Sequence, residues 1–311
     1  MSKKSNNNGR AFEFSFINAL AKAIKLHRPV LLKQDDHYSA SQSAWNATES
    51  SIQDDLNKAS SSVLNDVFEL EPNLINGLSN LELYIQPDSQ GEKGDVRDVV
   101  AKDASISWEV GFSLKHNHFA VKHSRLSRNI DFGSTWYNCA CSQTYWDKIK
   151  PIFDRLQTLK NQNIEWNQVS DKIDTIYKPL LQAFMDEVSR AVCASSKVPQ
   201  RMVEYLLGTY DFWKMIGIDD KQQTQLIAFN LRNELGHNST VVIPKTSLPS
   251  SIVGICFSPK HPDNTVLLAF DEGWTFSFRI HNASTVCEPS LKFDIQIVGM
   301  PTSMFSVICN W

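Results

Sequence analysis

The chain has 311 residues and 42% hydrophobic content, and its formal net charge at pH 7 is −3. This length allows one large domain or two ordinary ones, and the composition is that of a globular protein. No apolar run approaches the roughly 18 residues of a membrane-spanning helix, so we expect no membrane segment. The 6 cysteines form no Cys-x-x-Cys pair. With no recognisable signal peptide, they predict reduced thiols in a cytoplasmic protein.

The first predicted element is an amphipathic helix. Apolar residues recur at helical spacing from Phe12 to Ile24, after a polar start. Glu13 lies beside this stripe, where it is either a solvated acid near the helix start or part of a site. Residues 33–62 are rich in Ser, Asp, Asn and Gln, and they form either a mobile insertion or a helix that covers a binding cleft. Leu81–Ile85 predicts a short apolar strand.

A β-hairpin is the clearest pattern in the next stretch. Hydrophobic and polar residues alternate with a period of two over Ser107–Lys115, which predicts a strand with one buried face. Asp95–Lys102 predicts a shorter strand ahead of it, and Asp103–Ser105 predicts the tight turn between them.

This hairpin brings an acid and a lysine together. In the predicted register Asp95 lies opposite Ser113, two residues from Lys115, whereas a different register would put Asp98 there instead. Hydrolysis of a phosphodiester requires carboxylates that hold Mg²⁺ and a cationic group that orients water and offsets developing charge. An Asp and an x-Lys on adjacent strands is the arrangement of the PD-(D/E)xK nucleases. The same pair is also an ordinary cross-strand contact in unrelated proteins.

The segment that follows is basic. Lys115–Arg128 holds 4 fixed positive charges, 3 histidines and no acid, a local surface suited to nucleic acid despite the negative net charge. The alternative is a solvated basic loop. Candidate DNA contacts are Asn117, His118, Lys122, His123, Arg125, Ser127, Arg128 and Asn129. Of these, Arg125, Arg128 and Asn129 are candidates for base contacts, because arginine pairs with guanine O6 and N7 in the major groove.

The remainder of the chain predicts a helical region followed by a region of β-strands. Apolar residues at helical spacing predict helices from Thr144 to about Leu235, and short runs punctuated by Gly, Pro and Asn after Val241 predict an antiparallel sheet. A second polar cluster lies near the end of one of these strands and serves either ordinary strand and turn structure or sequence recognition. Its candidate DNA contacts are Arg279, His281 and Asn282.

Several of these segments resemble the HaeIII-type restriction endonucleases, type II enzymes of the PD-(D/E)xK class. The matching stretches are Asn7–Glu13, Gly94–Val100, Trp108–Ser127, Arg279–Ser284 and Ser290–Asp294. The resemblance implies Mg²⁺-dependent cleavage of double-stranded DNA at a short palindrome, GGCC in the namesake. It also implies a restriction–modification system, in which the cognate DNA methyltransferase is a genetic rather than a physical partner. A palindrome implies a homodimer, or sequential nicking by a monomer.

One position departs from the class pattern. The class has Asp or Glu two residues before the lysine, where this chain has Ser113. Glu109 lies on the same face but roughly 13 Å away, so Glu13 or Asp98 is a better replacement. The expected catalytic set is Asp95, Lys115, Glu13, Asp98, Glu109 and Ser113, with Asp95, Glu13 and Asp98 as metal ligands.

We therefore expect an α/β fold with a mixed-sheet PD-(D/E)xK nuclease core, a helical region and a C-terminal antiparallel β region. Residues 1–143 would form the nuclease core, with an insertion at about 33–62. Residues 144–240 would be the helical region, and residues 241–311 would form a β-rich region for DNA recognition. The alternatives are a DNA-repair or structure-specific nuclease on the same scaffold, and a DNA-binding protein with a degenerate nuclease site.

Overall fold

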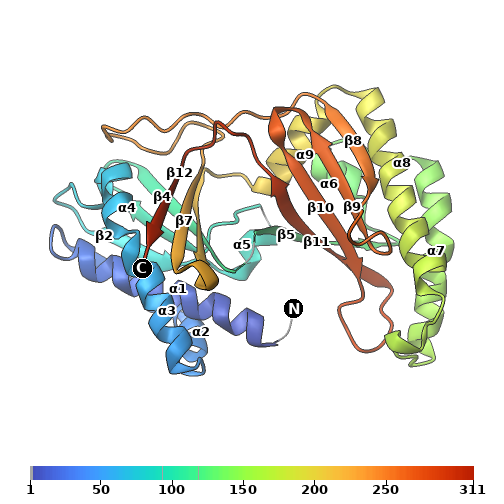
Figure 1. The fold of residues 1–311 in the computed structure, drawn as a ribbon, viewed down its shortest axis with the longest axis horizontal. Helices are drawn as coiled ribbons and strands as arrows, with labels where there is room; N and C mark the ends of the chain where they lie inside the picture. Colours follow the sequence, from blue (N-terminus) through green and yellow to red (C-terminus); the bar gives the residue numbers. More distant parts are fainter. Residues whose placement is uncertain (1–2, 93, 118) are drawn as a thin grey trace. The chain divides into compact units, whose positions relative to one another are not determined.

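The computed structural model describes residues 3–92, 94–117 and 119–311 (Figure 1). The chain forms two compact units. Unit 1 comprises Met1–Phe119, Gly208–Ser247 and Ser303–Trp311, and unit 2 comprises Ala120–Leu207 and Leu248–Thr302. Both units are assembled from separate stretches of chain. The division into consecutive regions 1–143, 144–240 and 241–311 stays a prediction.

Unit 1 is built on a seven-stranded mixed sheet with the strand order β1-β2-β3-β4-β6-β7-β12. Two neighbouring pairs, β1–β2 and β4–β6, are parallel, and the other pairs are antiparallel. The strands are β1 (Val30–Leu32), β2 (Leu81–Ile85), β3 (Val99–Asp103), β4 (Trp108–His116), β6 (Phe212–Ile218), β7 (Gln223–Phe229) and β12 (Ser306–Asn310). The predicted α/β class with a mixed sheet is confirmed.

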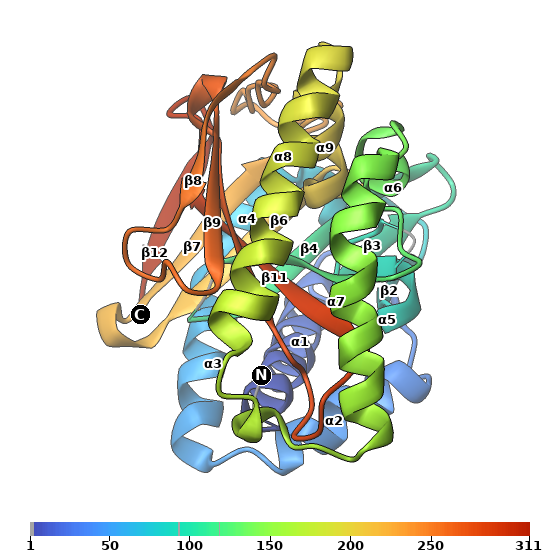
Figure 2. The same ribbon diagram turned by 90° about the vertical axis from the view of Figure 1, so that its right-hand side faces the viewer.

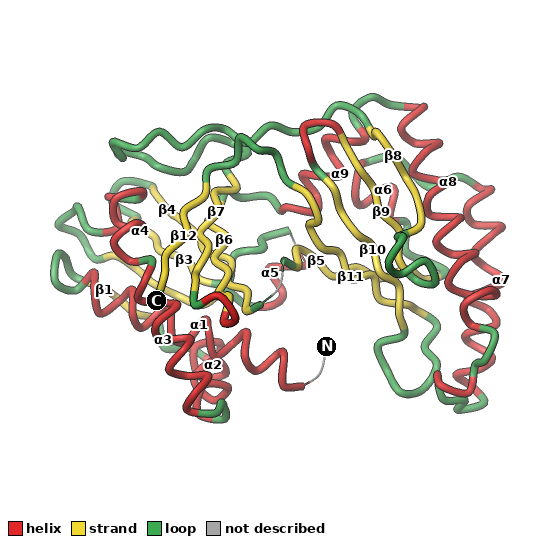
Figure 3. Tube along the Cα trace, in the orientation of Figure 1, coloured by secondary structure: helices red, strands yellow, loops and turns green. Residues whose placement is uncertain are grey.

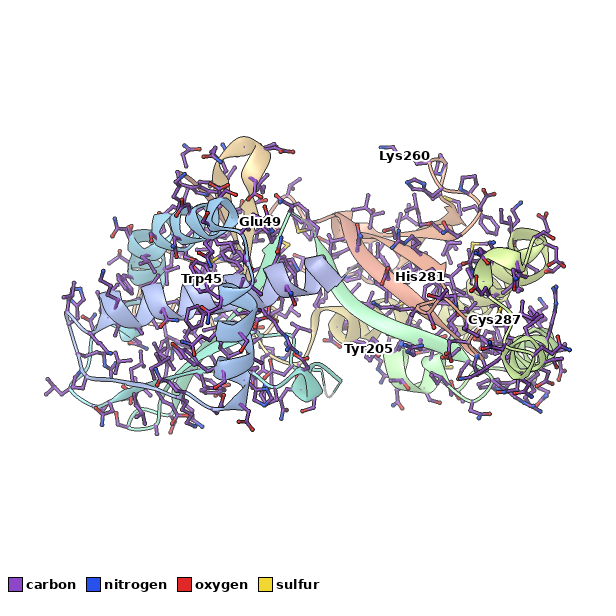
Figure 4. All side chains as sticks on the ribbon, turned by 90° about the horizontal axis from the view of Figure 1, so that it is seen from below. Trp45, Glu49, Tyr205, Lys260, His281 and Cys287 are labelled. Carbon is purple, nitrogen blue, oxygen red and sulfur yellow. The ribbon has the colours of Figure 1, made fainter. Side chains whose placement is uncertain are left out.

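Helices gather beside this sheet (Figure 3). They are α1 (Lys3–Ile24), α2 (Asp36–Asn46), α3 (Ser50–Ser62), α4 (Leu64–Leu70), α5 (Asp88–Glu92) and the short helices Pro72–Leu74 and Asp219–Lys221. The predicted apolar stripe of α1 is buried, and Phe16 packs edge-on against Phe112 of β4 at 5.0 Å between ring centroids. Residues 33–62 form α2 and α3, which pack against α1, and Trp45 lies 5.8 Å from the ring of Phe14 (Figure 4).

Unit 2 contains the five-stranded antiparallel sheet, in the order β5-β11-β10-β9-β8. Its strands are β5 (Ala120–Ser127), β8 (Ile252–Phe257), β9 (Thr265–Phe270), β10 (Thr275–His281) and β11 (Ser290–Gly299). Its helices are α6 (Phe132–Tyr137), α7 (Gln143–Asn161), α8 (Lys178–Ala194), α9 (Val198–Leu207) and the short helices Trp166–Gln168, Ile173–Tyr177 and Asp271–Gly273. Phe184 of α8 packs against Phe278 and Phe293 of the sheet, and α7 lies alongside α8 (Figure 2).

The helices predicted after Thr144 are confirmed as far as Leu207, and so is the antiparallel sheet after Val241. The helical prediction for residues 212–229 was wrong, because this stretch forms β6 and β7 of unit 1. Strand β6 lies in the middle of the sheet and is buried on both faces. Its sequence is therefore almost entirely apolar, and hydrophobic periodicity cannot distinguish it from a buried helix. Within the part of the chain that the structure describes, no helix is both long enough and apolar enough to cross a membrane.

Glu71 is a fully buried acid that links separate segments of unit 1. Its Oε1 accepts hydrogen bonds from the indole Nε1 of Trp213 at 2.8 Å and from the backbone N–H of Gly236 at 2.9 Å. Burial raises the pKa of this carboxyl from 4.5 to about 7, while the two hydrogen bonds oppose the shift. Because the pKa is higher in the folded protein, the contribution of Glu71 to stability is complete below pH 4.5 and is lost as the pH rises through 7.

We expect Glu71→Gln to remove this pH dependence. The glutamine carbonyl keeps the acceptor for Trp213 and Gly236 but does not titrate. The wild-type protein should therefore lose about 3 kcal/mol more of its unfolding free energy between pH 5 and pH 8 than the variant does. Urea unfolding of both proteins at the two pH values measures this difference, and equal losses in both would contradict it.

Candidate active site

The hairpin of β3 and β4 pairs in a different register from the one predicted. Val99 pairs with Phe112 and Asp103 pairs with Trp108, so the connection is residues 104–107 and not Asp103–Ser105. The backbone N–H of Asp98 donates to the carbonyl of Phe112 at 2.7 Å. The prediction that Asp95 lies opposite Ser113 was wrong, and Asp98 takes that place.

Asp95 instead belongs to a buried ion-pair network around Arg97. The Arg97 Nε and Nη2 donate to the two carboxylate oxygens of Asp95 at 2.8 and 2.7 Å, and its Nη1 donates to Glu109 at 2.7 Å. The guanidinium lies 3.9 Å from the ring centroid of Tyr210. A Cβ at Gly111 would come within 2.0 Å of the Arg97 side chain, so this glycine makes room for it. Two of the predicted catalytic acids, Asp95 and Glu109, thus neutralise one buried arginine.

Asp98 and Lys115 form the contact that the sequence assigned to Asp95. The Lys115 Nζ donates to Asp98 Oδ2 at 2.9 Å. The same oxygen accepts from the backbone N–H of Leu114 at 2.6 Å and from the Ser113 hydroxyl at 3.3 Å. The side chains of Lys115 and Asp98 are 21% and 23% exposed, so both remain accessible to a ligand. Ser113, at the position where the class has an acid, therefore helps to fix the acid of the neighbouring strand.

Glu13 of α1 is electrostatically coupled to this pair. Burial, and then the negative charge of Asp98, raise the pKa of Glu13 to about 8, while Lys115 and a hydrogen bond from Ser41 oppose the shift. The Ser41 hydroxyl donates to Glu13 Oε2 at 3.0 Å. The helix acid and the strand acid thus repel each other when no cation is present.

Lys214 of β6 is a fourth charged residue here, and the sequence reasoning missed it. Strands β4 and β6 are parallel neighbours, and Lys214 pairs with Ser113. The side chain is buried, and burial together with the charge of Lys115 lowers its pKa to about 7. The available signal was a single lysine inside the apolar run Phe212–Ile218, which the helical prediction obscured.

The polar residues that end β4 are held by Asp219. The Nε2 of His116 lies 2.8 Å from its carboxylate, and Asn117 Nδ2 donates to it at 2.9 Å. The backbone N–H of Asp219 donates back to Asn117 Oδ1 at 3.0 Å. These contacts give His116 and Asn117 a structural role at the end of β4. His118 lies outside the described residues.

The other predicted DNA contacts lie in unit 2. Arg128 forms an ion pair with Asp154 at 2.5 Å, and Arg125 donates to the Ser290 hydroxyl at 3.0 Å. The Ser127 hydroxyl accepts from the backbone N–H of Asn129 at 3.3 Å. Lys122 and His123 are on β5, and their side chains lie outside the described part of the structure.

The predicted cluster at the end of β10 converges on an acid of β11. Arg279 Nη2 lies 2.8 Å and His281 Nε2 lies 3.1 Å from Asp294 Oδ2. Asn282 instead donates to the carbonyls of Ser284 and Val286, which is turn structure. The structure thus brings Arg279 and His281 together but gives Asn282 a local role.

A mixed sheet with a strand acid, a helix acid and a lysine gathered at the end of a central hairpin fits the class of α/β nucleases. A model of the HaeIII restriction endonuclease family matches residues 9–301 of the chain. The chain is 44% identical over 317 residues to the type II restriction enzyme HaeIII of Haemophilus aegyptius, across 100% of this chain and 99% of that protein. No solved structure matches. The chain therefore belongs to the HaeIII restriction endonuclease family, and it is a type II site-specific DNA endonuclease.

Proposed function

We propose that this enzyme makes Mg²⁺-dependent double-strand cuts in duplex DNA at GGCC, using a PD-(D/E)xK site in which Asp98 holds the position of the strand acid. The observation that carries the catalytic assignment is the contact between Lys115 Nζ and Asp98 Oδ2 at 2.9 Å, on side chains that are partly exposed. The target sequence rests on the 44% identity to the type II restriction enzyme HaeIII over the whole chain.

The acids of the site fit a magnesium ion. Among the described residues no group of three or more His, Cys, Asp or Glu side chains is poised to hold a metal. Asp98 and Glu13, however, supply two carboxylates, the hard oxygen ligands that Mg²⁺ prefers alongside waters and substrate phosphate. The raised pKa of Glu13 reflects in part the charge of Asp98, a repulsion that a divalent cation would relieve. When bound, the ion would polarise the scissile phosphate and offset its developing charge.

The protein side chains would divide the remaining work. Lys115 would orient the attacking water and stabilise negative charge on the phosphoryl oxygens. Ser113 and the backbone N–H of Leu114 fix the Asp98 carboxylate, so that its orientation does not depend on the substrate. Glu13 of α1 would supply the second carboxylate that the class places where this chain has Ser113. The products would carry 5′-phosphate and 3′-hydroxyl ends.

A palindromic target is matched by a two-fold symmetric homodimer, or by a monomer that nicks the two strands in turn. The enzyme would act in the cytoplasm on foreign DNA, with host sites protected by a cognate methyltransferase.

Digestion of phage DNA with Mg²⁺, followed by sequencing of the fragment ends, tests the proposal. We expect discrete fragments whose ends lie within GGCC, and none when EDTA replaces the metal. A smear, or cleavage confined to branched DNA, would indicate a repair or structure-specific nuclease. Intact DNA that migrates more slowly would indicate a DNA-binding protein with a degenerate site.

A further inference from the structure

On one face of the sheet in unit 2, polar side chains of neighbouring strands lie opposite one another. We call this set of side chains the polar grid. The opposite face is apolar, and its Phe278 and Phe293 pack against α8. On the polar face Arg279 pairs with Asp294, and His281 pairs with Lys292. Lys292 in turn pairs with Arg125 on β5. Cationic or titratable side chains therefore recur on three adjacent strands, at the 4.8 Å or so that separates neighbouring strands.

Asp294 is the centre of this grid. Its side chain is only 7% exposed, and three side chains approach it: Arg279 at 2.8 Å, His281 at 3.1 Å and Lys292 at 3.5 Å. The Arg279 side chain is 52% exposed. A buried carboxylate thus holds the guanidinium through Nη2, while half of the arginine surface faces outward. Figure 4 marks the place of His281 on this sheet.

The other arginines predicted to contact bases are not held in this way. Arg128 pairs with Asp154, but the two side chains are 55% and 49% exposed, so water competes for the contact. Arg125 is exposed and bonds to a neutral serine hydroxyl. A side chain fixed by a buried, charged acceptor loses less conformational entropy when it binds, which favours a directional contact.

We propose that Arg279 is a specificity-determining residue that donates to the O6 and N7 atoms of a guanine in the recognition site, with Asp294 as its positioning residue. This inference rests on the proposed function, because a GGCC site contains only guanine and cytosine. Planar, bidentate donation by arginine suits the two acceptors of guanine in the major groove. His281 and Lys292 also lie 3.1 and 3.5 Å from the carboxylate of Asp294, so this acid is held from three sides beside the arginine.

The test pairs a protein variant with a base analogue. Binding is measured by gel shift without divalent metal, so that no cleavage occurs, on a duplex with one GGCC site and on duplexes in which 7-deazaguanine, which lacks N7, replaces each guanine in turn. Wild-type affinity should fall roughly 5- to 100-fold at one guanine position. Arg279→Ala removes the donors to both O6 and N7, so it should lose at least that factor on unmodified DNA and should lose no more when that position carries the analogue.

Arg128→Ala is the matched control. Arg128 was also a candidate for a base contact, but its acidic partner is exposed, so we expect it to contact phosphate. The substitution should therefore weaken binding to all the duplexes equally while keeping the response to 7-deazaguanine. Asp294→Asn should weaken binding to the unmodified site by a smaller factor than Arg279→Ala and should still respond to the analogue, which separates positioning from direct contact. Far-ultraviolet circular dichroism verifies that each variant is folded.

Two results would overturn the inference. One is an Arg279→Ala variant that keeps the wild-type response to the analogue at every position. The other is an equal loss of affinity for GGCC and for duplexes without it, which would make Arg279 a phosphate contact. Cleavage of GGCC by the wild-type enzyme is measured alongside. If it fails, the proposed function fails; if it succeeds while either result holds, only the role of Arg279 is wrong.

Discussion

Asp98→Asn should reduce the rate of DNA cleavage by at least about 1000-fold while leaving DNA binding and folding largely intact. The asparagine carbonyl can still accept the hydrogen bond from the backbone N–H of Leu114, so the strand end keeps its structure. The substitution removes the charge opposite Lys115 and a carboxylate oxygen for the metal. Single-turnover cleavage of a duplex with one GGCC site measures the loss, and gel shift measures the binding.

Asp95→Asn is the matched control, because it makes the same chemical change three residues away. Arg97 is only 4% exposed and would lose the stronger of its two acidic partners. Breaking a buried pair of this kind costs about 3–5 kcal/mol. The variant should therefore unfold at a lower temperature than the wild-type protein. At temperatures where it is still folded, its cleavage rate should be within about tenfold of the wild-type rate. A stable but inactive Asp95→Asn, together with an active Asp98→Asn, would return the catalytic role to Asp95.

The sequence pattern put Asp95 in the place that Asp98 occupies in the structure, because a local pattern does not contain the long-range contacts that set the register of a hairpin. The alternation over β4 correctly predicted a strand that ends near Lys115, but the turn before it was placed at Asp103–Ser105 from its residue types alone. In the structure Asp103 stays on β3, because its carboxylate is bound by the buried Arg28 at 2.5 Å. Arg28 also donates to the carbonyls of Asn73 and Ser79. The contact between Arg28 and Asp103 joins residues 75 positions apart in the sequence. It moves the turn, and with it the register of the hairpin.

Lys214 was missed for a related reason, because local sequence patterns do not predict which distant strands are neighbours in a sheet. The sequence predicted Glu13, Ser113 and Lys115 as neighbours in one site. It did not predict β6, whose apolar run was assigned to a helix, so the strand beside β4 and its buried lysine were missing. Parallel neighbours such as β4 and β6 require a long connection, and here that connection includes most of unit 2. Hydrophobic periodicity alone does not predict the pairing of strands that are so far apart in the sequence.

Glu13→Gln should abolish most of the pH dependence of the enzyme's magnesium requirement. The pKa of Glu13 is about 8 in the metal-free protein, so below pH 8 the cation must displace a proton from this carboxyl in order to bind. The half-saturating Mg²⁺ concentration for cleavage should therefore fall about tenfold for each unit of pH between 6 and 8 and level off above 8. In the variant the requirement should be higher, and only a shallower slope below pH 7 should remain, because the pKa of Lys214 is about 7 and its charge opposes a cation there.

The control for this prediction is Lys214→Met. The pKa of Lys214 is lowered to about 7, so this group also titrates in the window, and its charge opposes a cation below pH 7. Removing it should lower the magnesium requirement at pH 6 but keep a slope up to pH 8, because Glu13 still titrates. A wild-type requirement that does not change with pH, or a slope that persists unchanged in Glu13→Gln, would show that Glu13 is not a ligand. The second metal ligand beside Asp98 would then be an oxygen of the DNA phosphate or of another residue.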